Sequence, residues 1–279
     1  MTERAFRIGV VAPGGALAAE VEPRVHALAA ERYGDRVEIV FHPQCFERCG
    51  HFAGDDARRT EAFLEIANDP SFDALWFGRG GYGSNRIVEA ACAGLAPAAA
   101  EKAYLGYSDA GTILAALYMK GFRNVAHGPM PGDIRMDGGE AAVARGLAWL
   151  VERSPGALEP SLEGGGPPVA AFNLVILAHL IGTPQEPDLS GHVLMVEEIG
   201  EYMYRIDRDL CQVTSAPGMA RLAGLRMGRC TGVPENDPDF VLTEEDVARF
   251  WCERAGIPYL GRADIGHDAG NKVAPFGPR

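Results

Sequence analysis

The sequence has no long apolar run and little positive charge, and both deficits exclude classes of function. Nowhere do about eighteen apolar residues follow one another, so we expect no membrane span. Lys and Arg number 26 against 38 Asp and Glu, which gives a formal net charge of −12. Because this balance opposes contact with a phosphate backbone, nucleic acid is not an expected partner.

Cysteine is present but follows no ordered pattern. The six cysteines form no CxxC pair and show no spacing typical of a zinc site or a disulfide framework. We therefore predict no metal and no cofactor, and a reducing cytoplasm as the location. The first apolar run, 8–12, is too short for a signal-peptide core and is better interpreted as a buried strand.

The overall composition is that of an ordinary globular protein, with 47% apolar and 23% charged residues. The 279 residues suffice for two domains with cores of their own. Residues 152–169 are rich in Pro, Gly and Ser, which neither a helix nor a central strand tolerates. We therefore predict an N-terminal domain at 1–151, a linker at 152–169 and a smaller C-terminal domain at 170–279.

The N-terminal half alternates short apolar runs with helical patterns, which predicts an α/β fold. Strands are expected at Phe6–Ala12, Val37–Phe41, Ala74–Phe77 and Ala103–Gly106. Helices are expected at Leu17–Tyr33, Arg58–Ala67, Ser84–Ala93 and Gly111–Lys120. Regular alternation predicts a doubly wound parallel sheet, with ligand sites at the carboxyl ends of its strands.

The C-terminal half has a less regular pattern, which predicts a smaller mixed α/β domain. Its expected elements are helices at Asn173–Ile181, Arg205–Thr214 and Thr243–Ala255, and a buried strand at Val193–Val196.

A strand runs directly into a helix through Gly106-Tyr107-Ser108-Asp109-Ala110. This segment nearly matches the G-x-S-x-G elbow, in which small residues make a turn sharp enough to expose the serine hydroxyl. The backbone N–H of Asp109, at the start of the helix, could stabilise an oxyanion beside Ser108. The alternative is that Ser108 merely caps the helix.

A second informative segment is the glycine-rich turn 78–86, which also joins a strand to a helix. Its backbone could approach a ligand closely and supply another N–H to an oxyanion. A phosphate cradle at the helix N-terminus and a plain turn are the alternatives, although the spacing fits neither a Walker loop nor GxGxxG.

Together these segments resemble the serine L,D-carboxypeptidases, which include muropeptide L,D-carboxypeptidases and the microcin C self-immunity proteins. The resemblance covers nearly the whole chain. The motifs that carry it are Phe52-Ala53-Gly54-Asp55, Arg79-Gly80-Gly81-Tyr82, Gly106-Tyr107-Ser108-Asp109, His127-Gly128-Pro129-Met130, Tyr204-Arg205-Ile206-Asp207-Arg208 and Gly266-His267.

The resemblance implies a Ser-Glu-His triad made of Ser108, Glu197 and His267. The residues themselves agree with it, because Glu197 ends an apolar strand and His267 follows Gly266 in a loop. On spacing alone, Glu198 or Glu201 could equally be the acid. Seven histidines compete for the role of base; the closest rival, His127, is interpreted as structural, shaping the floor of the cleft.

The expected substrate is a muropeptide that ends in D-alanine. The N–H groups of Asp109 and Gly81 would receive the oxyanion. Arg79, Arg86 and Arg205 are candidates for binding the terminal carboxylate, and the sequence does not separate them. Family resemblance also suggests a homodimer. The alternatives are a hydrolase of aminoacyl nucleotide analogues and a non-catalytic protein that binds a small ligand.

The chain departs from the family pattern in places. Ala171-Phe172 stands where many members have two glycines, and Gly14 replaces the usual serine after Pro13. We expect Phe172 to alter the shape beside the cleft and with it the substrate range. The chain also stops soon after Pro275-Phe276-Gly277.

Overall fold

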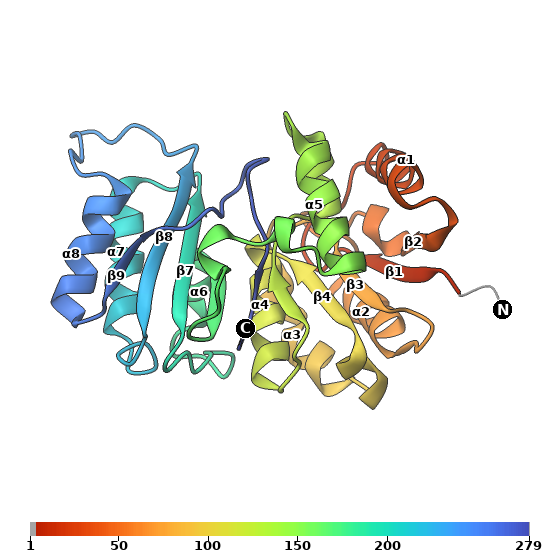
Figure 1. Ribbon diagram of the computed structural model, residues 1–279, viewed down its shortest axis with the longest axis horizontal. Coiled ribbons are helices and arrows are strands. Elements are labelled where there is room, and N and C mark those ends of the chain that lie inside the picture. The colour runs from red at the N-terminus through yellow and green to blue at the C-terminus, as the bar shows by residue number, and fades with distance from the viewer. Residues whose placement is uncertain (1–3, 279) are drawn as a thin grey trace.

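The computed structural model describes residues 4–278; the first three residues and Arg279, which open and close the two predicted domains, lie outside it. Two separate sheets organise the chain (Figure 1). One has six strands in the order β10-β5-β4-β3-β1-β2, and the other has four in the order β6-β7-β8-β9. This arrangement confirms the predicted α/β class.

The elements of both halves have the following bounds. The strands are β1 (Phe6–Val11), β2 (Val37–Phe41), β3 (Ala74–Phe77), β4 (Ala103–Gly106), β5 (Val125–His127), β6 (Val169–Asn173), β7 (Val193–Ile199), β8 (Gly224–Thr231), β9 (Tyr259–Arg262) and β10 (Ala274–Pro275). The helices are α1 (Val21–Tyr33), α2 (Asp56–Asn68), α3 (Ser84–Ala93), α4 (Gly111–Met119), α5 (Gly139–Glu152), α6 (Leu174–Leu180), α7 (Met203–Ser215) and α8 (Glu244–Ala255).

The six-stranded sheet is doubly wound. Strands β1 to β5 are parallel, with α1 and α5 on one face and α2, α3 and α4 on the other (Figure 1). Helices on both faces explain why β3 and β4 are buried along their whole length. The chain continues from β1 to β2 on one side and to β3 on the other, so the strand order reverses at β1. Such a reversal leaves a crevice at the carboxyl ends of the strands.

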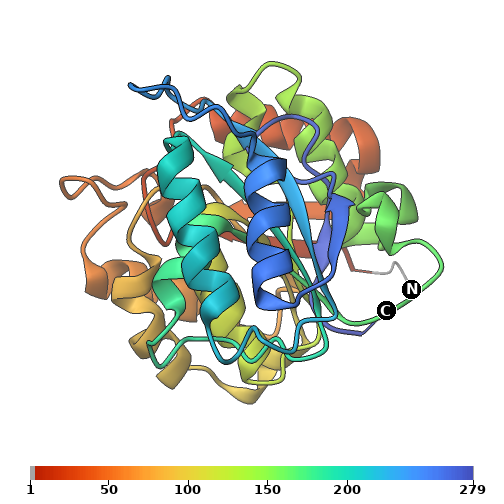
Figure 2. The same ribbon diagram turned by 90° about the vertical axis from the view of Figure 1, so that its left-hand side faces the viewer.

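The second sheet is also parallel, and α7 and α8 lie side by side over its outer face (Figure 2). Its other helix, α6, packs against α4 of the first half. Strand β7 is buried except at its last residue, which matches its apolar sequence. In the part of the chain that the structure describes, no helix is both long and apolar enough to cross a membrane.

The last strand returns to the first sheet. After β9 the chain runs back toward the N-terminal half (Figure 1), where β10 pairs antiparallel with β5. Next to it, Val169 and Gly277 form an antiparallel bridge. Part of the segment predicted as a linker is therefore ordered: two short 3₁₀ helices, Pro155–Ala157 and Pro160–Leu162, precede β6, which begins at Val169.

Candidate active site

Ser108 occupies a strained turn at the carboxyl end of β4. Its φ of 58° lies in the left-handed region, which non-glycine residues rarely adopt. The turn leads at once into α4. Gly80 packs directly against this serine, because a Cβ atom added there would lie 2.6 Å from the Ser108 Oγ. Only glycine at position 80 leaves the hydroxyl room, as the elbow interpretation requires.

The side chain of Asp109 fastens the glycine-rich turn to this elbow. Its carboxylate accepts the N–H of Gly83 at 3.2 Å and both the N–H and the hydroxyl of Ser84 at 3.0 and 2.7 Å. Burial raises the pKa of Asp109, and these bonds oppose the rise. Gly14 also packs here: an added Cβ would lie 2.7 Å from the Asp109 Oδ2, so a serine would not fit without movement.

Glu197 and His267 form a buried pair. The imidazole Nδ1 lies 2.5 Å from Oε2 of Glu197, which lies in the second half of β7, and the glutamate side chain is 0% exposed. Burial by itself would lower the pKa of His267, but the Glu197 charge and hydrogen bond outweigh burial, and the pKa is raised. Because Nδ1 is engaged by the carboxylate, Nε2 is the nitrogen left to exchange a proton elsewhere.

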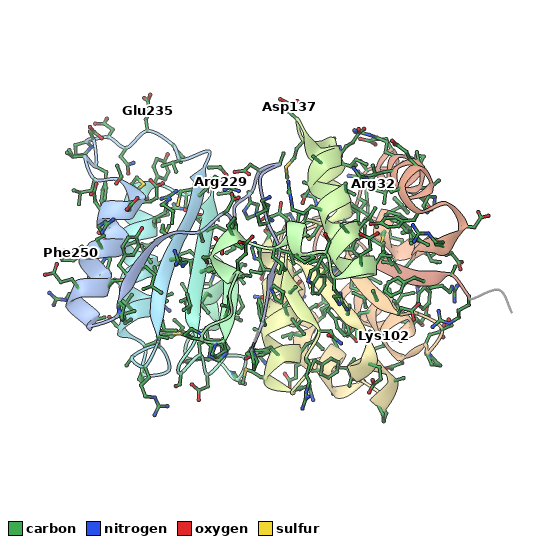
Figure 3. All side chains as sticks on the ribbon, in the orientation of Figure 1. Arg32, Lys102, Asp137, Arg229, Glu235 and Phe250 are labelled. Carbon is green, nitrogen blue, oxygen red and sulfur yellow. The ribbon has the colours of Figure 1, made fainter. Side chains whose placement is uncertain are left out.

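Arg229 holds the loop that carries His267. It lies toward the carboxyl end of β8, in the half of the molecule that holds the four-stranded sheet (Figure 3). Its guanidinium binds both carboxylate oxygens of Asp268, with Nη2 2.9 Å from Oδ1, and also pairs with Asp264. Two ion pairs therefore flank His267, three residues before it and one after.

The N-terminal half holds the same loop from the other side. Arg145 of α5 donates to the carbonyl oxygens of Ala269 and Asn271 at 3.0 and 2.7 Å. The Asn271 side-chain oxygen accepts from the N–H of Gly266 at 3.2 Å and lies 3.3 Å from Nε2 of His127. The position of the loop thus depends on both halves of the molecule.

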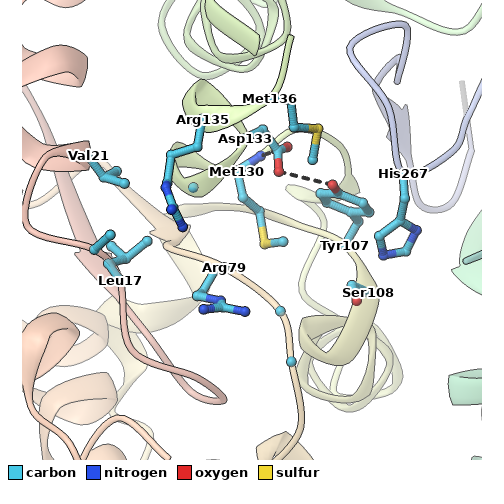
Figure 4. A pocket seen from close by; sticks show the side chains of 14 residues that line it. Leu17, Val21, Arg79, Tyr107, Ser108, Met130, Asp133, Arg135, Met136 and His267 are labelled. Carbon is cyan, nitrogen blue, oxygen red and sulfur yellow. Dashed lines mark hydrogen bonds between the residues drawn. The ribbon is translucent and has the colours of Figure 1, made fainter. Parts of the chain in front are cut away.

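Ser108 and His267 line the same cavity, which has a volume of about 420 Å³. It opens at the carboxyl ends of the strands, beside α1 and the segment after β5 (Figure 4). Its other lining residues are Leu17, Ala18, Val21, Arg79, Gly80, Gly81, Tyr107, Met130, Gly132, Asp133, Arg135 and Met136. A serine, a buried His–Glu pair and cationic side chains therefore meet at one concave surface, which suits acyl transfer to a serine.

Comparisons with known protein families cover most of the chain. Residues 8–128 match the LD-carboxypeptidase N-terminal domain, and residues 168–279 match the LD-carboxypeptidase C-terminal domain. The chain belongs to the LD-carboxypeptidase family. The murein tetrapeptide carboxypeptidase of Pseudomonas aeruginosa is 26% identical over 291 residues, which cover 97% of this chain and 91% of the relative.

Solved structures share this fold. The muramoyltetrapeptide carboxypeptidase from Oxalobacter formigenes superimposes with a TM-score of 0.80 at 25% identity, covering 96% of this chain and 93% of that one. The microcin C7 self-immunity protein MccF, in complex with glutamyl sulfamoyl guanosine, gives a TM-score of 0.78 at 16% identity, covering 99% and 92%. The second likeness shows the fold alone.

The structure places the three predicted arginines differently. Arg79 lines the cavity and donates to the carbonyl oxygen of Ala16 at 3.0 Å. Arg86, on α3, pairs with Asp56 at 2.7 Å, and Arg205, on α7, pairs with Glu201 at 3.0 Å. Neither of these two lines the cavity that contains Ser108.

Arg135 lines the cavity and was missed by the sequence analysis. It pairs with Glu20 at 3.0 Å, and both side chains are more than half exposed, so the pair is weak and the guanidinium stays available. The sequence pattern indicates a role for Arg135 only weakly, because the residue lies five positions beyond His127-Gly128-Pro129-Met130, in a segment without clear periodicity.

The alternative acids and bases occupy other environments. Glu198 accepts the Asn173 side-chain amide and two backbone N–H groups, and burial raises its pKa to about 7. Glu201 pairs with Arg205. His127 is fully buried, its pKa falls to about 3 through burial, and it does not line the cavity. Of these residues, none contacts His267 as Glu197 does.

Phe172 is buried and packs its ring 5.1 Å from that of Phe276, outside the cavity lining. All six cysteines are free. Across residues 4–278, no three His, Cys, Asp or Glu side chains are grouped so that they could hold a metal ion.

Proposed function

We propose that this protein is a serine L,D-carboxypeptidase that removes the terminal D-alanine from murein tetrapeptides. The observation that carries the proposal is the convergence of Ser108 and the Glu197–His267 pair on one cavity. Membership of the LD-carboxypeptidase family and the names of its relatives support the reaction class. The substrate bond would join an L-configured centre of a diamino acid to the D-residue.

In the proposed mechanism His267 is the general base. Its Nε2 takes the hydroxyl proton as Ser108 Oγ attacks the scissile carbonyl, and Glu197 fixes the tautomer and stabilises the imidazolium. The N–H groups of Gly81 and Asp109 would receive the oxyanion. When the C–N bond breaks, the imidazolium gives its proton to the departing amine. Water then attacks the acyl-enzyme with His267 again as base, releasing the acid and restoring the serine.

The terminal carboxylate needs a cation near the leaving group. Of the three predicted arginines, Arg79 is favoured because it lines the cavity, whereas Arg86 and Arg205 are paired with carboxylates elsewhere. Inverting the terminal centre would exchange the carboxylate with a methyl group or hydrogen and leave the charge unpaired. Discrimination of about 30-fold to several thousandfold would follow.

The first test compares two tetrapeptides that differ only at the terminal alanine. We expect purified protein to release free D-alanine, measured by mass spectrometry, and to leave the L-epimer intact. Ser108→Ala should be inactive but folded. Equal cleavage of both epimers, or cleavage of an aminoacyl sulfamoyl adenylate alone, would favour the second candidate, a hydrolase of aminoacyl nucleotide analogues, which the fold of MccF supports.

The acid can be tested with adjacent glutamates as a matched pair. Glu197→Gln removes the charge that orients His267, so kcat should fall by about a thousandfold or more. Glu198→Gln alters a carboxyl group that contacts Asn173 instead, and should lower kcat far less. Equal losses would contradict the assignment.

A protein that fluorophosphonates do not label would be the non-catalytic binding protein. Homodimerisation and a cytoplasmic location stay predictions.

A further inference from the structure

Tyr107 and Asp133 form a buried pair beside the proposed base, and the mechanism above gives neither a task. Tyr107 immediately precedes Ser108, and its hydroxyl donates to Asp133 Oδ1 over 3.0 Å. Oδ2 of the same carboxylate accepts the backbone N–H of Met130 over 2.8 Å. Both side chains are almost fully buried, and both line the cavity (Figure 4).

The ring of Tyr107 connects this carboxylate to the imidazole. The ring centroids of Tyr107 and His267 lie 4.7 Å apart, with 56° between the planes, which is a packed contact of tilted rings. The ring of His127 lies 5.5 Å from that of Tyr107 as well. Because Asp133 accepts the hydrogen bond of its hydroxyl, the tyrosine ring has a fixed position, and the His267 imidazole packs against it.

Several charged groups face this pair and the imidazole. The carboxylates of Glu197, Asp133 and Glu198 all raise the pKa of His267 against the effect of burial, and Asp268 acts on Tyr107. Two guanidinium groups, those of Arg79 and Arg135, line the same cavity.

The protonation states of the pair follow from its burial. Burial raises the pKa of Asp133 to about 6, and it raises that of Tyr107 well above the ordinary value. At neutral pH the phenol is therefore a donor and Asp133 an anion. His127, whose pKa is about 3, is neutral under the same conditions.

We propose that Asp133, acting through Tyr107, is a positioning residue that orients the His267 imidazole and sets its basicity together with Glu197. The proposal rests on the function proposed above, because it requires His267 to be the base. Glu197 fixes the ring at Nδ1, while Tyr107 limits its tilt. A second anion near the ring also stabilises the imidazolium that forms when Ser108 loses its proton.

The test follows the rate at which a fluorophosphonate labels Ser108 as the pH is varied, since labelling needs the nucleophile and its base but no peptide. Asp133→Asn keeps the shape of the side chain and removes its charge. Because the imidazolium then loses a stabilising anion, the rising limb of the profile should move to lower pH by about one unit. Asp209→Asn, a change at a buried carboxyl group on α7 outside the cavity, should leave the limb in place.

The outcomes separate the two proposals. If Asp133→Asn gives the wild-type profile, the role of Asp133 is refuted. If the wild-type protein itself is not labelled, the proposed function fails instead. Thermal unfolding of each variant shows that folded proteins are being compared, and if Asp133→Asn does not fold, the tyrosine variants decide.

The second comparison uses two tyrosines: Tyr107, which follows β4, and Tyr104, which lies in β4. Tyr107→Phe keeps the ring and removes the donor to Asp133, so the plateau rate of labelling should fall about tenfold through loss of orientation. Tyr104 is equally buried and donates to the Ala99 carbonyl oxygen at 2.8 Å, away from the cavity. Tyr104→Phe should therefore label at the wild-type rate. Equal losses in the two variants would mean a purely structural role and overturn the proposal.

Discussion

At the scale of single residues, the site depends on backbone conformations that few side chains tolerate. Ser108 adopts a positive φ, and Gly80 leaves its hydroxyl free because a Cβ there would collide with it. Strain of this kind persists where the surrounding structure enforces it, which is common at reactive centres. Here β4, the start of α4 and the bonds of Asp109 to Gly83 and Ser84 enforce it.

The strain at Ser108 can be measured with two variants that both lack the hydroxyl. Ser108→Gly relieves the left-handed conformation, whereas Ser108→Ala retains it, so the glycine variant should be more stable by about 1 kcal/mol. Urea unfolding of the two proteins measures the difference. Both variants should be inactive. Because glycine also loses more backbone freedom on folding, an alanine variant more stable than the glycine variant would show that the turn stores little strain.

His127 gives a pH dependence whose sign follows from its burial. Its folded pKa of about 3 lies below the ordinary value of 6.5, so the unfolded chain binds the proton first as the pH falls. Stability from this group is complete above pH 6.5 and declines below it. Between pH 7 and pH 5 the wild type should lose about 2 kcal/mol more than His127→Gln.

The same comparison controls for the other buried groups. Asp133 and Glu198, with raised pKa values of about 6 and about 7, change stability in the opposite sense over this range. Because both are present in the wild type and in His127→Gln, their effects cancel in the difference. Parallel stability curves for the two proteins would contradict a buried, neutral His127.

At the scale of elements, the sequence predicted those whose periodicity is strong. The strands Val37–Phe41, Ala74–Phe77 and Ala103–Gly106 and the helix Ser84–Ala93 occur with the predicted bounds. Helix α1 begins at Val21 rather than at Leu17, because Leu17 and Ala18 are not helical and line the cavity.

Other elements carried too little local signal. Helix α5 contains Gly139 and Gly146, which have low helix propensity, and β8 interrupts its apolar residues with Arg226 and Arg229. Strand β10 has two residues and exists only because β5 lies beside it. The elbow at Ser108 could be predicted from local chemistry, but the choice of Glu197 needed the family resemblance, since pairing with His267 joins positions 70 residues apart.

The loop that carries His267 should depend on Arg229 for its catalytic position. Arg229→Gln removes the ion pairs to Asp264 and Asp268, so the imidazole would be less well placed, and kcat should fall about 10- to 100-fold with little change in KM. Arg249→Gln, which breaks a single ion pair on the exposed face of α8, is the control and should have no effect. An Arg229→Gln enzyme with wild-type kcat would show that the loop is positioned without these two ion pairs.

At the scale of the whole molecule, the reactive groups come from different sheets. Ser108 follows β4 of the six-stranded sheet, whereas Glu197 lies in β7 of the four-stranded sheet and His267 follows β9. A shift of either half would therefore separate the proposed nucleophile, Ser108, from the proposed base, His267. Among the contacts that oppose such a shift are the pairing of β10 with β5, the bonds of Arg145 to the His267 loop, and the aromatic rings around Phe276.

Phe276 is a buried side chain that contacts both halves of the molecule. Its ring lies 5.1 Å from Phe172 of β6 and 5.7 Å from Tyr118 of α4, and it is 3% exposed. Phe276→Ala would leave a cavity between the halves and lower the free energy of unfolding by about 3 to 5 kcal/mol. Because catalysis needs both halves in register, kcat should fall even at temperatures where the variant is folded.

Two further variants distinguish the effect of Phe276→Ala on stability and kcat from a general loss of aromatic surface. Phe250→Ala removes an exposed phenylalanine from α8 and should change neither the melting temperature nor kcat appreciably. Phe276→Leu fills much of the volume and should recover part of both quantities if packing is the cause. Full activity in folded Phe276→Ala would mean that the pairing of β10 with β5 and the bonds of Arg145 to the His267 loop keep the halves aligned without this ring.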